Sequence, residues 1–256
     1  MAKDFKEKKT WYTPVAEIYH QARPKYPQTL IDQAMILAKL NPSTEVLELG
    51  CGSGNATIAF AHLDLPMTCL EINSEFLRLA QHNCRAYPQV EIYNTSFEEW
   101  KIESKFHAVL SANAFHWFSP KVKYAKVAAS LKNNGFLILL WNLTPEPPLE
   151  IFQALNEIYQ VYTPSLFKYE GAAKQAKILT GFQQDIEDSG YFVDFSSEQV
   201  ACILSYGIDE YINLTSTLRR LNTETQKMLF NSIKKKLQEY EDCVELSYLT
   251  AIQIAR

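Results

Sequence analysis

The chain has 256 residues, of which 47% are hydrophobic and 21% are charged. Only 8 residues are glycine and no internal period is visible, so the composition excludes a repeat array, a collagen-like rod and a disordered chain. A formal net charge of -4 provides no overall attraction for nucleic acid or for an anionic membrane. The composition therefore predicts one large domain, or one domain with an elaborated cap, without a nucleic-acid or membrane partner. It makes no prediction of oligomeric state.

The first residues lack the features of a secretory signal. Residues 1–9 are rich in charge and lead directly to Trp11 and Tyr12, whereas a signal peptide needs an apolar stretch. The longest strongly apolar run, residues 136–141, is far shorter than the ~20 residues that span a bilayer. The five cysteines are scattered and form no C-x-x-C pair, which indicates neither a disulfide framework nor a metal site. We expect a cytoplasmic protein with reduced thiols and no bound metal.

Helices and strands alternate through the first half of the chain. Helical spacing of apolar residues predicts a helix over residues 27–40, which Asn41 and Pro42 end. There follow, in order, a strand (45–49), a helix (55–62), a strand (67–71), a helix (75–84) capped by Ser74, two strands (90–93 and 106–111), a helix (121–131), a turn at Asn134 and Gly135, and a strand (136–141). Strands separated by helices imply right-handed crossovers and a doubly wound, mostly parallel sheet.

The regular alternation stops after Asn142. Prolines interrupt the chain, and a long amphipathic region runs from residue 149 to about 189, with polar loops around 169–173. Two late strands (195–204 and 244–255) are separated by helical segments (208–218 and 223–240). No flexible linker precedes this half, so we expect it to add the far edge of one seven-stranded sheet, with helices inserted as a cap. The predicted divisions are an N-terminal helical segment (1–44), a core (45–142) and a cap with the last strands (143–256).

Residues 46–54 read VLELGCGSG and form a strand followed by a glycine-rich turn. Such a turn lets backbone N–H groups approach a ligand closely at the start of the next helix. The dinucleotide fingerprint G-x-G-x-x-G would need glycine or alanine at position 55, where this chain has asparagine. A phosphate-binding loop would need a lysine after the glycines, and none follows. The turn therefore predicts a ligand other than a dinucleotide or a nucleoside triphosphate.

Two carboxylates indicate which ligand this is. Glu48 ends the first strand beside the glycine turn, where its charge would repel a pyrophosphate but suits an ammonium group, directly or through water. Glu71 ends the second strand, at the position where a carboxylate can accept both hydroxyls of a ribose. An ammonium group and a ribose together describe S-adenosylmethionine.

With these residues in place, the chain resembles the class I methyltransferases, and more narrowly the small-molecule methyltransferases of the ubiquinone/menaquinone type. Its Ala-Phe-His-Trp segment (114–117) and Arg-Pro-Lys-Tyr-Pro element (23–27) are similar to a branch that includes proteins resembling trans-aconitate methyltransferase. The resemblance covers most of the chain. It implies a Rossmann-like α/β fold, S-adenosylmethionine as cofactor, a small-molecule methyl acceptor, and an N-terminal segment that closes over the cofactor.

The resemblance also implies which positions bind the cofactor. They are Arg23, Glu48, Gly50, Cys51, Gly52, Gly54, Glu71, Ile72, Ser96, Phe97 and Asn113. Many relatives carry aspartate at the position of Ser96. Arg23 or Tyr19 is expected near the carboxylate of the cofactor, and Phe97 has packing in the core as an equal alternative.

His116 is the candidate catalytic residue. Its imidazole could take a proton from the acceptor as the methyl group moves, since an unperturbed histidine pKa near ~6.5 suits a general base. Methyl transfer needs no base when the nucleophile is already a carboxylate or thiolate, because the sulfonium is an activated electrophile and alignment supplies much of the rate. Contact with the cofactor or orientation of the acceptor is therefore the alternative role of His116.

The expected reaction is methyl transfer to an oxygen, nitrogen or carbon atom of a small molecule. Motifs typical of enzymes that modify nucleic-acid bases are missing. Aromatic residues of the cap either enclose the acceptor or form the core of the cap: Tyr159, Tyr162, Phe167, Tyr169, Phe182, Tyr206 and Tyr211. Two alternatives stay open. One is a non-catalytic module that binds S-adenosylmethionine, and the other is an NAD-dependent oxidoreductase, which Glu48, Asn55 and the lack of a Tyr-x-x-x-Lys pair oppose.

Overall fold

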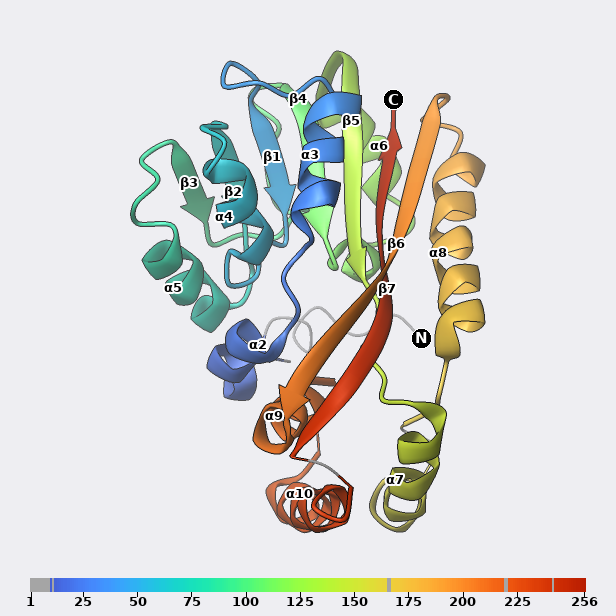
Figure 1. Ribbon diagram of the computed structural model, residues 1–256. Helices are drawn as coiled ribbons and strands as arrows, with labels where there is room; N and C mark the ends of the chain where they lie inside the picture. The colour runs from blue at the N-terminus through green and yellow to red at the C-terminus, as the bar shows by residue number, and fades with distance from the viewer. Residues whose placement is uncertain (1–9, 11, 165–166, 219–220, 241) are drawn as a thin grey trace.

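A twisted seven-stranded sheet forms the centre of the computed structural model, which describes residues 10, 12–164, 167–218, 221–240 and 242–256 (Figure 1). The strands are β1 (Val46–Leu49), β2 (Met67–Leu70), β3 (Val90–Tyr93), β4 (Phe106–Ala112), β5 (Leu131–Asn142), β6 (Phe195–Gly207) and β7 (Cys243–Ala255). Their order across the sheet is β3-β2-β1-β4-β5-β7-β6. The first five are parallel to one another, and β7 is antiparallel to both β5 and β6. The predicted doubly wound, mostly parallel sheet is confirmed.

Helices cover both faces of this sheet. The helical elements are η1 (Thr13–Val15), α2 (Ala16–Ala22), α3 (Gln28–Leu37), α4 (Asn55–Ala61), α5 (Ser74–Asn83), η2 (Phe115–Trp117), α6 (Lys123–Ser130), α7 (Leu149–Tyr162), α8 (Gly171–Asp188), α9 (Ile208–Leu218) and α10 (Thr223–Leu237). Buried residues of α3, α4 and α5 pack with one face of the strands, and those of α6 and α8 pack with the other. Successive residues of a strand point to opposite faces, so Val46 lies in the first core and Leu47 in the second.

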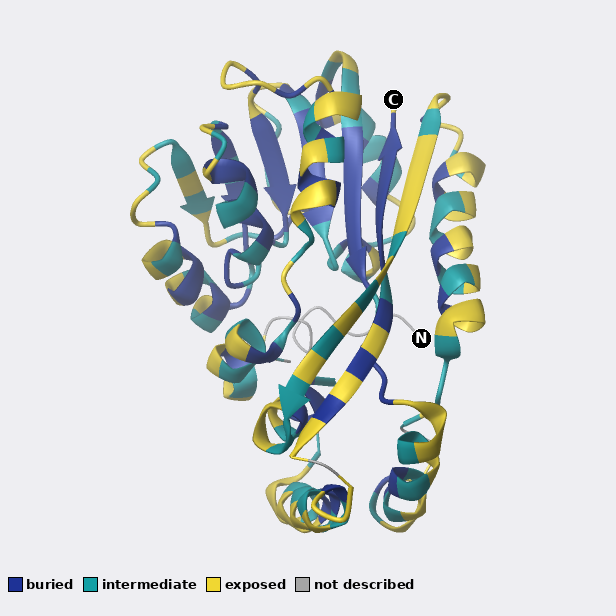
Figure 2. Cartoon of the chain, viewed as in Figure 1, coloured by how far each residue is buried: buried dark blue, intermediate teal, exposed yellow. Residues whose placement is uncertain are grey.

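The last two strands form a ribbon that extends beyond the sheet. β6 and β7 pair along their whole length, whereas β5 pairs only with residues 250–255 of β7. The projecting half of β7 alternates between exposed and buried residues, and the half inside the sheet is buried throughout (Figure 2). One face of the projecting half is therefore buried against other elements, and the opposite face is exposed.

The buried face carries the cap. Residues from α7, α9, α10 and β7 form a third hydrophobic core around the end of the ribbon, including Leu155, Leu214, Ile233 and Leu246. Tyr159 and Tyr211 are buried within it, and their hydroxyl oxygens are 3.2 Å apart. The late strands belong to the same sheet as the first five. Helices α7, α9 and α10 assemble at its projecting end, whereas α8 packs on a face of the sheet.

Two local predictions were wrong. The cap of α5 is Asn73, whose Oδ1 accepts hydrogen bonds from the backbone N–H groups of Glu75 and Phe76 at 3.0 Å each. Ser74 is the first residue of the helix. Strand β5 begins at Leu131 instead of residue 136, because the expected turn is an irregularity within the strand. Pairing with β4 passes from Leu131 directly to Phe136, and Asn134 between them has a φ of +62°.

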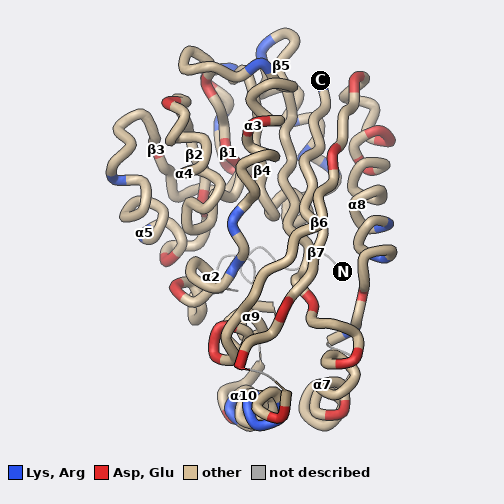
Figure 3. The backbone as a smooth tube through the Cα atoms, in the orientation of Figure 1, with Lys and Arg blue, Asp and Glu red and all other residues tan. Residues whose placement is uncertain are grey.

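Residues of both charges, Lys and Arg in blue and Asp and Glu in red, are spread along the whole fold (Figure 3). The lysines near the end of α10 have acidic neighbours, since Lys234 lies 2.6 Å from Asp209 and Lys236 lies 2.6 Å from Glu239. Surface ion pairs of this kind contribute little to stability. Among the described helices, none is long and apolar enough to cross a membrane.

Replacing Asn73 with alanine should lower the free energy of unfolding by about 1 kcal/mol, because α5 loses its N-cap. Urea unfolding measures the change. Asn222 provides a matched control. Its side chain accepts a hydrogen bond from Thr225 N (2.8 Å) and is the N-cap of α10, which lies at the projecting end of the ribbon. Asn222→Ala should lose a similar amount. An Asn73→Ala variant as stable as the wild type would contradict the assignment of the cap.

Candidate functional site

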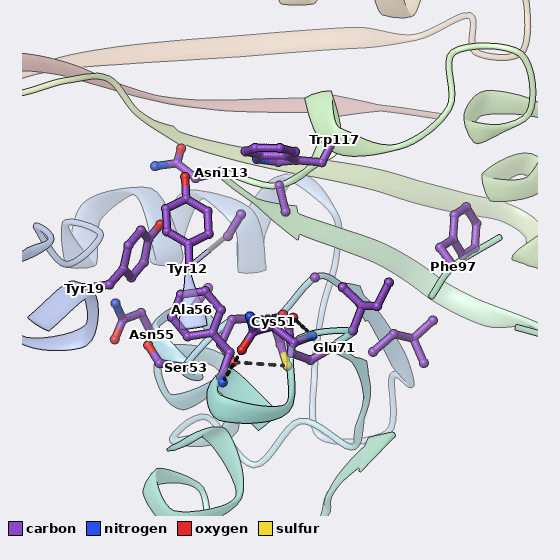
Figure 4. Close-up of a pocket in the computed structure, with 18 of the residues that line it drawn as sticks. Tyr12, Tyr19, Cys51, Ser53, Asn55, Ala56, Glu71, Phe97, Asn113 and Trp117 are labelled. Carbon is purple, nitrogen blue, oxygen red and sulfur yellow. Dashed lines mark hydrogen bonds between the residues drawn. The ribbon is translucent and has the colours of Figure 1, made fainter. Parts of the chain in front are cut away.

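A cavity lies at the carboxyl ends of β1, β2 and β4, where ligands bind in open α/β sheets. The turns after β1 and β2, the loops after β3 and β4, and the N-terminal segment surround it, with Tyr12 and Trp117 facing Cys51 and Glu71 (Figure 4). The sequence-predicted residues that line it are Arg23, Gly50, Cys51, Gly52, Glu71, Ile72, Ser96, Phe97 and Asn113. Glu48, Gly54 and His116 are not among its lining residues.

Backbone geometry explains two of the glycines in the turn after β1. Gly50 and Gly52 have φ values of +68° and +57°, a region that favours glycine. A Cβ atom on Gly50 would lie 2.9 Å from the Cβ of Ala114, so the loop after β4 can approach the turn only because Gly50 has no side chain. A Cβ on Gly52 would meet nothing within 4 Å, so the Gly52 backbone borders open space. Gly54 faces away, against Cys84 and Ala80 of the α5 region.

Glu71 joins the two turns at the floor of the cavity. Its Oε2 accepts a hydrogen bond from Gly52 N (2.8 Å) and its Oε1 accepts one from Asn73 N (2.7 Å). The side chain is nearly buried, and burial raises the pKa of its carboxyl group, while the N–H groups act in the opposite direction. A carboxylate can accept about four hydrogen bonds, so Glu71 retains the capacity to accept from a ligand.

Glu48 lies behind the glycine turn and not in the cavity. It is 0% exposed, and its Oε2 accepts hydrogen bonds from Thr57 Oγ1 (2.6 Å) and Cys69 Sγ (3.6 Å). No described residue hydrogen-bonds to its Oε1. Burial raises the pKa of Glu48 to about 7. Direct contact with an ammonium group, which the sequence suggested, does not fit this position, because Thr57 of α4 holds the carboxyl group behind the turn.

The N-terminal segment covers the cavity with aromatic rings. The ring of Tyr12 lies 5.1 Å from that of Tyr19, 5.6 Å from that of Phe76 and 6.2 Å from that of Trp117, measured between centroids. Asn73 donates a hydrogen bond to Thr13 Oγ1 (2.9 Å), which ties η1 to the turn after β2. Within the predicted N-terminal segment, Tyr12, Tyr19, Arg23, Pro24 and Tyr26 line the cavity, whereas residues 1–9 and 11 lie outside the described residues.

Arg23 connects the N-terminal segment to the cap. Its Nε donates to Thr217 Oγ1 (2.9 Å) and its Nη2 donates to Thr217 O (3.2 Å) on α9. The guanidinium also lies 4.9 Å from the centroid of the Tyr19 ring. Arg23 is therefore held at the wall of the cavity by α9 and α2 together.

Asn113 uses its side-chain amide to hold the end of β5. Its Nδ2 donates to Asn142 O (3.0 Å), and its Oδ1 accepts from Asn142 N (2.8 Å). Asn142 in turn donates to Pro24 O (2.9 Å) in the N-terminal segment. Asn113 lines the cavity, and its amide positions the surrounding backbone.

Phe97 both lines the cavity and packs in the core, so the two roles considered for it are not exclusive. Its side chain is 1% exposed, and its ring centroid lies 5.8 Å from that of Phe118. The neighbouring Ser96 directs its hydroxyl to Glu99, donating to Oε2 (3.0 Å) and accepting from N (3.1 Å).

His116 lies in η2 on the exposed side of the loop after β4. Its ring centroid is 5.5 Å from that of Trp117 and 5.9 Å from that of Trp141. Trp117 lines the cavity, so His116 stands next to the site without lining it. The seven cap aromatics do not line the cavity either. Most of them belong to the third core, while Phe182 stacks on Trp141 at 4.2 Å.

The sequence interpretation missed several lining residues. Tyr12, Asn73 and Phe76 border the cavity, although they were given no binding role. Asn73 had a usable signal, since asparagine is strongly preferred at a helix N-cap directly after a strand end. The aromatic residues had none, because their approach to one another depends on how the N-terminal segment folds back over α5.

Comparison with known proteins agrees with this geometry. Residues 46–135 match the family model described as a methyltransferase domain. An uncharacterized methyltransferase of Mycobacterium tuberculosis is 32% identical over 129 residues, which cover 50% of each chain. An uncharacterized methyltransferase-like protein of Schizosaccharomyces pombe is 28% identical over 169 residues, or 64% of each chain. Residues 46–135 of this chain therefore resemble a methyltransferase domain. The alignment with the Mycobacterium tuberculosis methyltransferase spans about half of that protein's length.

Solved structures of methyltransferases share the fold of this chain. A putative type II methyltransferase from Anaeromyxobacter dehalogenans has a TM-score of 0.58 at 17% identity, covering 91% of this chain and 97% of that one. An S-adenosylmethionine-dependent methyltransferase from Geobacter sulfurreducens, solved with S-adenosyl-L-homocysteine, has a TM-score of 0.52 at 13% identity, covering 94% and 97%. The fold of this chain is thus similar to those of solved methyltransferases over nearly its whole length.

Glu48 should make the folded protein less stable as the pH rises from about 4.5 to about 7. The pKa of Glu48 is raised from 4.5 to about 7 in the folded protein, so in this interval the folded chain keeps a proton that the unfolded chain releases. The unfolded state is favoured increasingly, by up to about 3 kcal/mol. Urea unfolding between pH 5 and pH 8 measures the free energy of unfolding of the wild type and of Glu48→Gln. As the pH rises, the variant should become more stable relative to the wild type. Parallel pH profiles would show that Glu48 titrates normally.

Proposed function

We propose that this protein transfers the methyl group of S-adenosylmethionine to an oxygen, nitrogen or carbon atom of a small molecule. The observation that carries the proposal is the Glu71 carboxylate, fixed by Gly52 N and Asn73 N at the floor of the cavity. A carboxylate at the end of β2 suits the two hydroxyls of a ribose. The open backbone at Gly52 suits the amino-acid tail of the same cofactor.

The charges around the cavity suit a cationic cofactor. Glu71 and Glu98 line it, and Arg23 is the one basic side chain among its described lining residues. An acidic site with aromatic walls favours a ligand that carries an ammonium and a sulfonium group, and it opposes a pyrophosphate. Arg23 is positioned to meet the carboxylate of the amino-acid tail. When bound, the cofactor would supply an activated methyl group, and the chain would align the acceptor and exclude water.

A small acceptor fits the enclosed side of the cavity. Tyr12, Tyr19 and Trp117 form a roof over the cavity, and this aromatic wall supports a small organic acceptor beside the cofactor. The segments around Arg23 and His116 support a position of this chain in the small-molecule branch that includes proteins similar to trans-aconitate methyltransferase. His116, beside Trp117, is assigned to contact with the acceptor at the rim.

Glu71→Ala should bind S-adenosylhomocysteine at least about tenfold more weakly than the wild type, because the ribose loses its acceptor and the two turns lose their bridge. Isothermal titration calorimetry measures the affinity. Glu71→Gln tests the charge at constant shape and should also bind weakly, since an amide cannot accept through both of its polar atoms. Glu103→Ala, at an exposed position, is the control. Wild-type affinity in both Glu71 variants would contradict the proposed site.

Transfer itself is tested with S-adenosylmethionine labelled in its methyl group and a panel of small carboxylic acids, amines and phenols. The proposal expects label in a product of low mass from at least one class. Replacing His116 with glutamine should weaken acceptor binding without abolishing transfer, because His116 is assigned to contact. Tight cofactor binding with no transfer to any acceptor would instead favour a non-catalytic module.

A further inference from the structure

One histidine joins the N-terminal segment to the glycine turn. The Nδ1 atom of His20, on α2, lies 3.0 Å from Ser53 Oγ, and its Nε2 lies 3.3 Å from Nδ2 of Asn83, the last residue of α5. The same Asn83 Nδ2 donates a hydrogen bond to Ser53 O (2.9 Å). Three side chains from α2, the glycine turn and α5 therefore meet at one point.

The hydrogen-bond roles in this group determine which form of His20 fits. A main-chain oxygen only accepts, so the atom of Asn83 that faces Ser53 O is its amide nitrogen, which only donates. His20 Nε2 faces the same amide nitrogen and must therefore be an unprotonated acceptor. The proton of neutral His20 is then on Nδ1, which donates it to Ser53 Oγ. A second proton, on Nε2, would set two donors against each other.

The surroundings of His20 also favour its neutral form. Burial is the largest influence and lowers the pKa of His20, while a hydrogen bond with Asn55 raises it. The charge of Lys25 lowers this pKa and that of Glu17 raises it. Glu17 is itself paired with Arg78 of α5 at 2.6 Å. The net result is a pKa below the ordinary value of a histidine.

The helices packed around α2 add other titratable groups, which are Glu75, Arg78 and His82 on α5 and Asp209, Glu210 and Tyr211 on α9. The elements η1 and α4 carry none. Glu75 is paired with Arg78 at 3.3 Å. The acidic residues of α9 lie in its first turn, whereas α9 contacts the N-terminal segment through Thr217, near its other end. Among the described residues, Lys25 and Glu17 are thus the charges that act on His20.

The group that His20 holds borders the cofactor cavity. Ser53 and Asn55 line the cavity, and so does Tyr19, the neighbour of His20 on α2 (Figure 4). His20 is not among the lining residues. Neutral His20 therefore holds the glycine turn and the aromatic roof together at the place proposed for the amino-acid tail of the cofactor.

We propose that His20 is a positioning residue for cofactor binding, which fastens the N-terminal segment to the glycine turn only in its neutral form. This inference rests on the proposed function, since it takes S-adenosylmethionine as the ligand. When the segment is detached, His20 is in water and takes up a proton near the ordinary histidine pKa of ~6.5. The fastened state resists that proton. Fastening therefore becomes less favourable as the pH falls below about 6.5, and the affinity for the cofactor falls with it.

Calorimetric titration with S-adenosylhomocysteine between pH 5.5 and pH 8 tests this dependence. From pH 8 to pH 5.5, the affinity of the wild type should fall about fivefold more than that of His20→Gln, whose side chain takes up no proton. The variant is the reference because Glu48, with a pKa of about 7, titrates in the same interval in both proteins. His82→Gln, at an exposed position on α5, is the control and should match the wild type.

Proton NMR of the histidine rings provides the reciprocal measurement. Binding of S-adenosylhomocysteine should lower the pKa of His20, because the ligand and the proton favour opposite states of the N-terminal segment. The signal of His20 is identified by its absence from the spectrum of His20→Gln. The measurement is made on the wild-type protein, so it does not depend on the stability of a variant.

A change of charge at Asn83 tests the hydrogen-bond roles. Asn83→Asp replaces the amide donor with a carboxylate, which can accept a hydrogen bond from a protonated Nε2. The pKa of His20 should therefore rise in this variant. Its affinity for S-adenosylhomocysteine should also fall less between pH 8 and pH 5.5 than that of the wild type, because the protonated form of His20 now fits.

The outcomes separate the inference from the proposed function. Parallel pH profiles of the wild type and His20→Gln would overturn the inference, and so would a pKa of His20 that the ligand leaves unchanged. An Asn83→Asp variant with the pH profile of the wild type would contradict the hydrogen-bond roles on which the inference rests. In each case the binding of S-adenosylhomocysteine would leave the proposed function in place. A wild type that binds no S-adenosylhomocysteine at any pH would overturn the proposed function as well.

Discussion

The carboxylate of Glu71 is the point on which the geometry of the cavity depends. Parallel strands β1 and β2 end at the same edge of the sheet, and each continues into a turn whose backbone N–H groups need partners. One buried carboxylate satisfies Gly52 N in the first turn and Asn73 N in the second. The two turns are thereby fixed relative to each other before a ligand arrives. Loss of this bridge would change the position of the glycine backbone and of the α5 N-terminus together.

The N-terminal segment is attached to the rest of the fold through several independent contacts. Asn142 at the end of β5 donates to Pro24 O, and Tyr206 on the projecting ribbon donates to Ala22 O (2.8 Å). Arg23 reaches Thr217 on α9. Core, ribbon and cap therefore all contact the segment that roofs the cavity. The long β6 and β7 strands make this possible, because they extend from the sheet to the helices of the cap (Figure 1).

Regular periodicity made most of the fold predictable. It did not reveal the direction of side chains in strands that are buried on both faces. The alternation of strands and helices follows from local pattern, and the glycine turn follows from spacing. Strand β1 is buried on both faces, so its sequence does not show that Glu48 points toward Thr57 instead of the cavity. The same local pattern misplaced the cap of α5 by one residue, since both Asn73 and Ser74 can cap a helix.

Contacts between distant segments account for the rest of what the sequence did not reveal. His20 and Asn83 are 63 positions apart in the chain, and the roof of aromatic rings joins η1, α2, α5 and η2. The aromatic residues of the cap were also not assigned by sequence. Their composition alone could not distinguish a substrate pocket from the core that Tyr159 and Tyr211 form. Nine of the eleven predicted binding positions nevertheless line the cavity. All of them except Arg23 follow the ends of strands, where local pattern places them.

The central claim is that the cavity around Glu71 binds S-adenosylmethionine and not a dinucleotide. Parallel calorimetric titrations of the wild-type protein with S-adenosylhomocysteine and with NAD test it most directly. The account predicts saturable binding of one S-adenosylhomocysteine per chain and no heat of binding with NAD. Binding of NAD, or the absence of binding by S-adenosylhomocysteine, would contradict it.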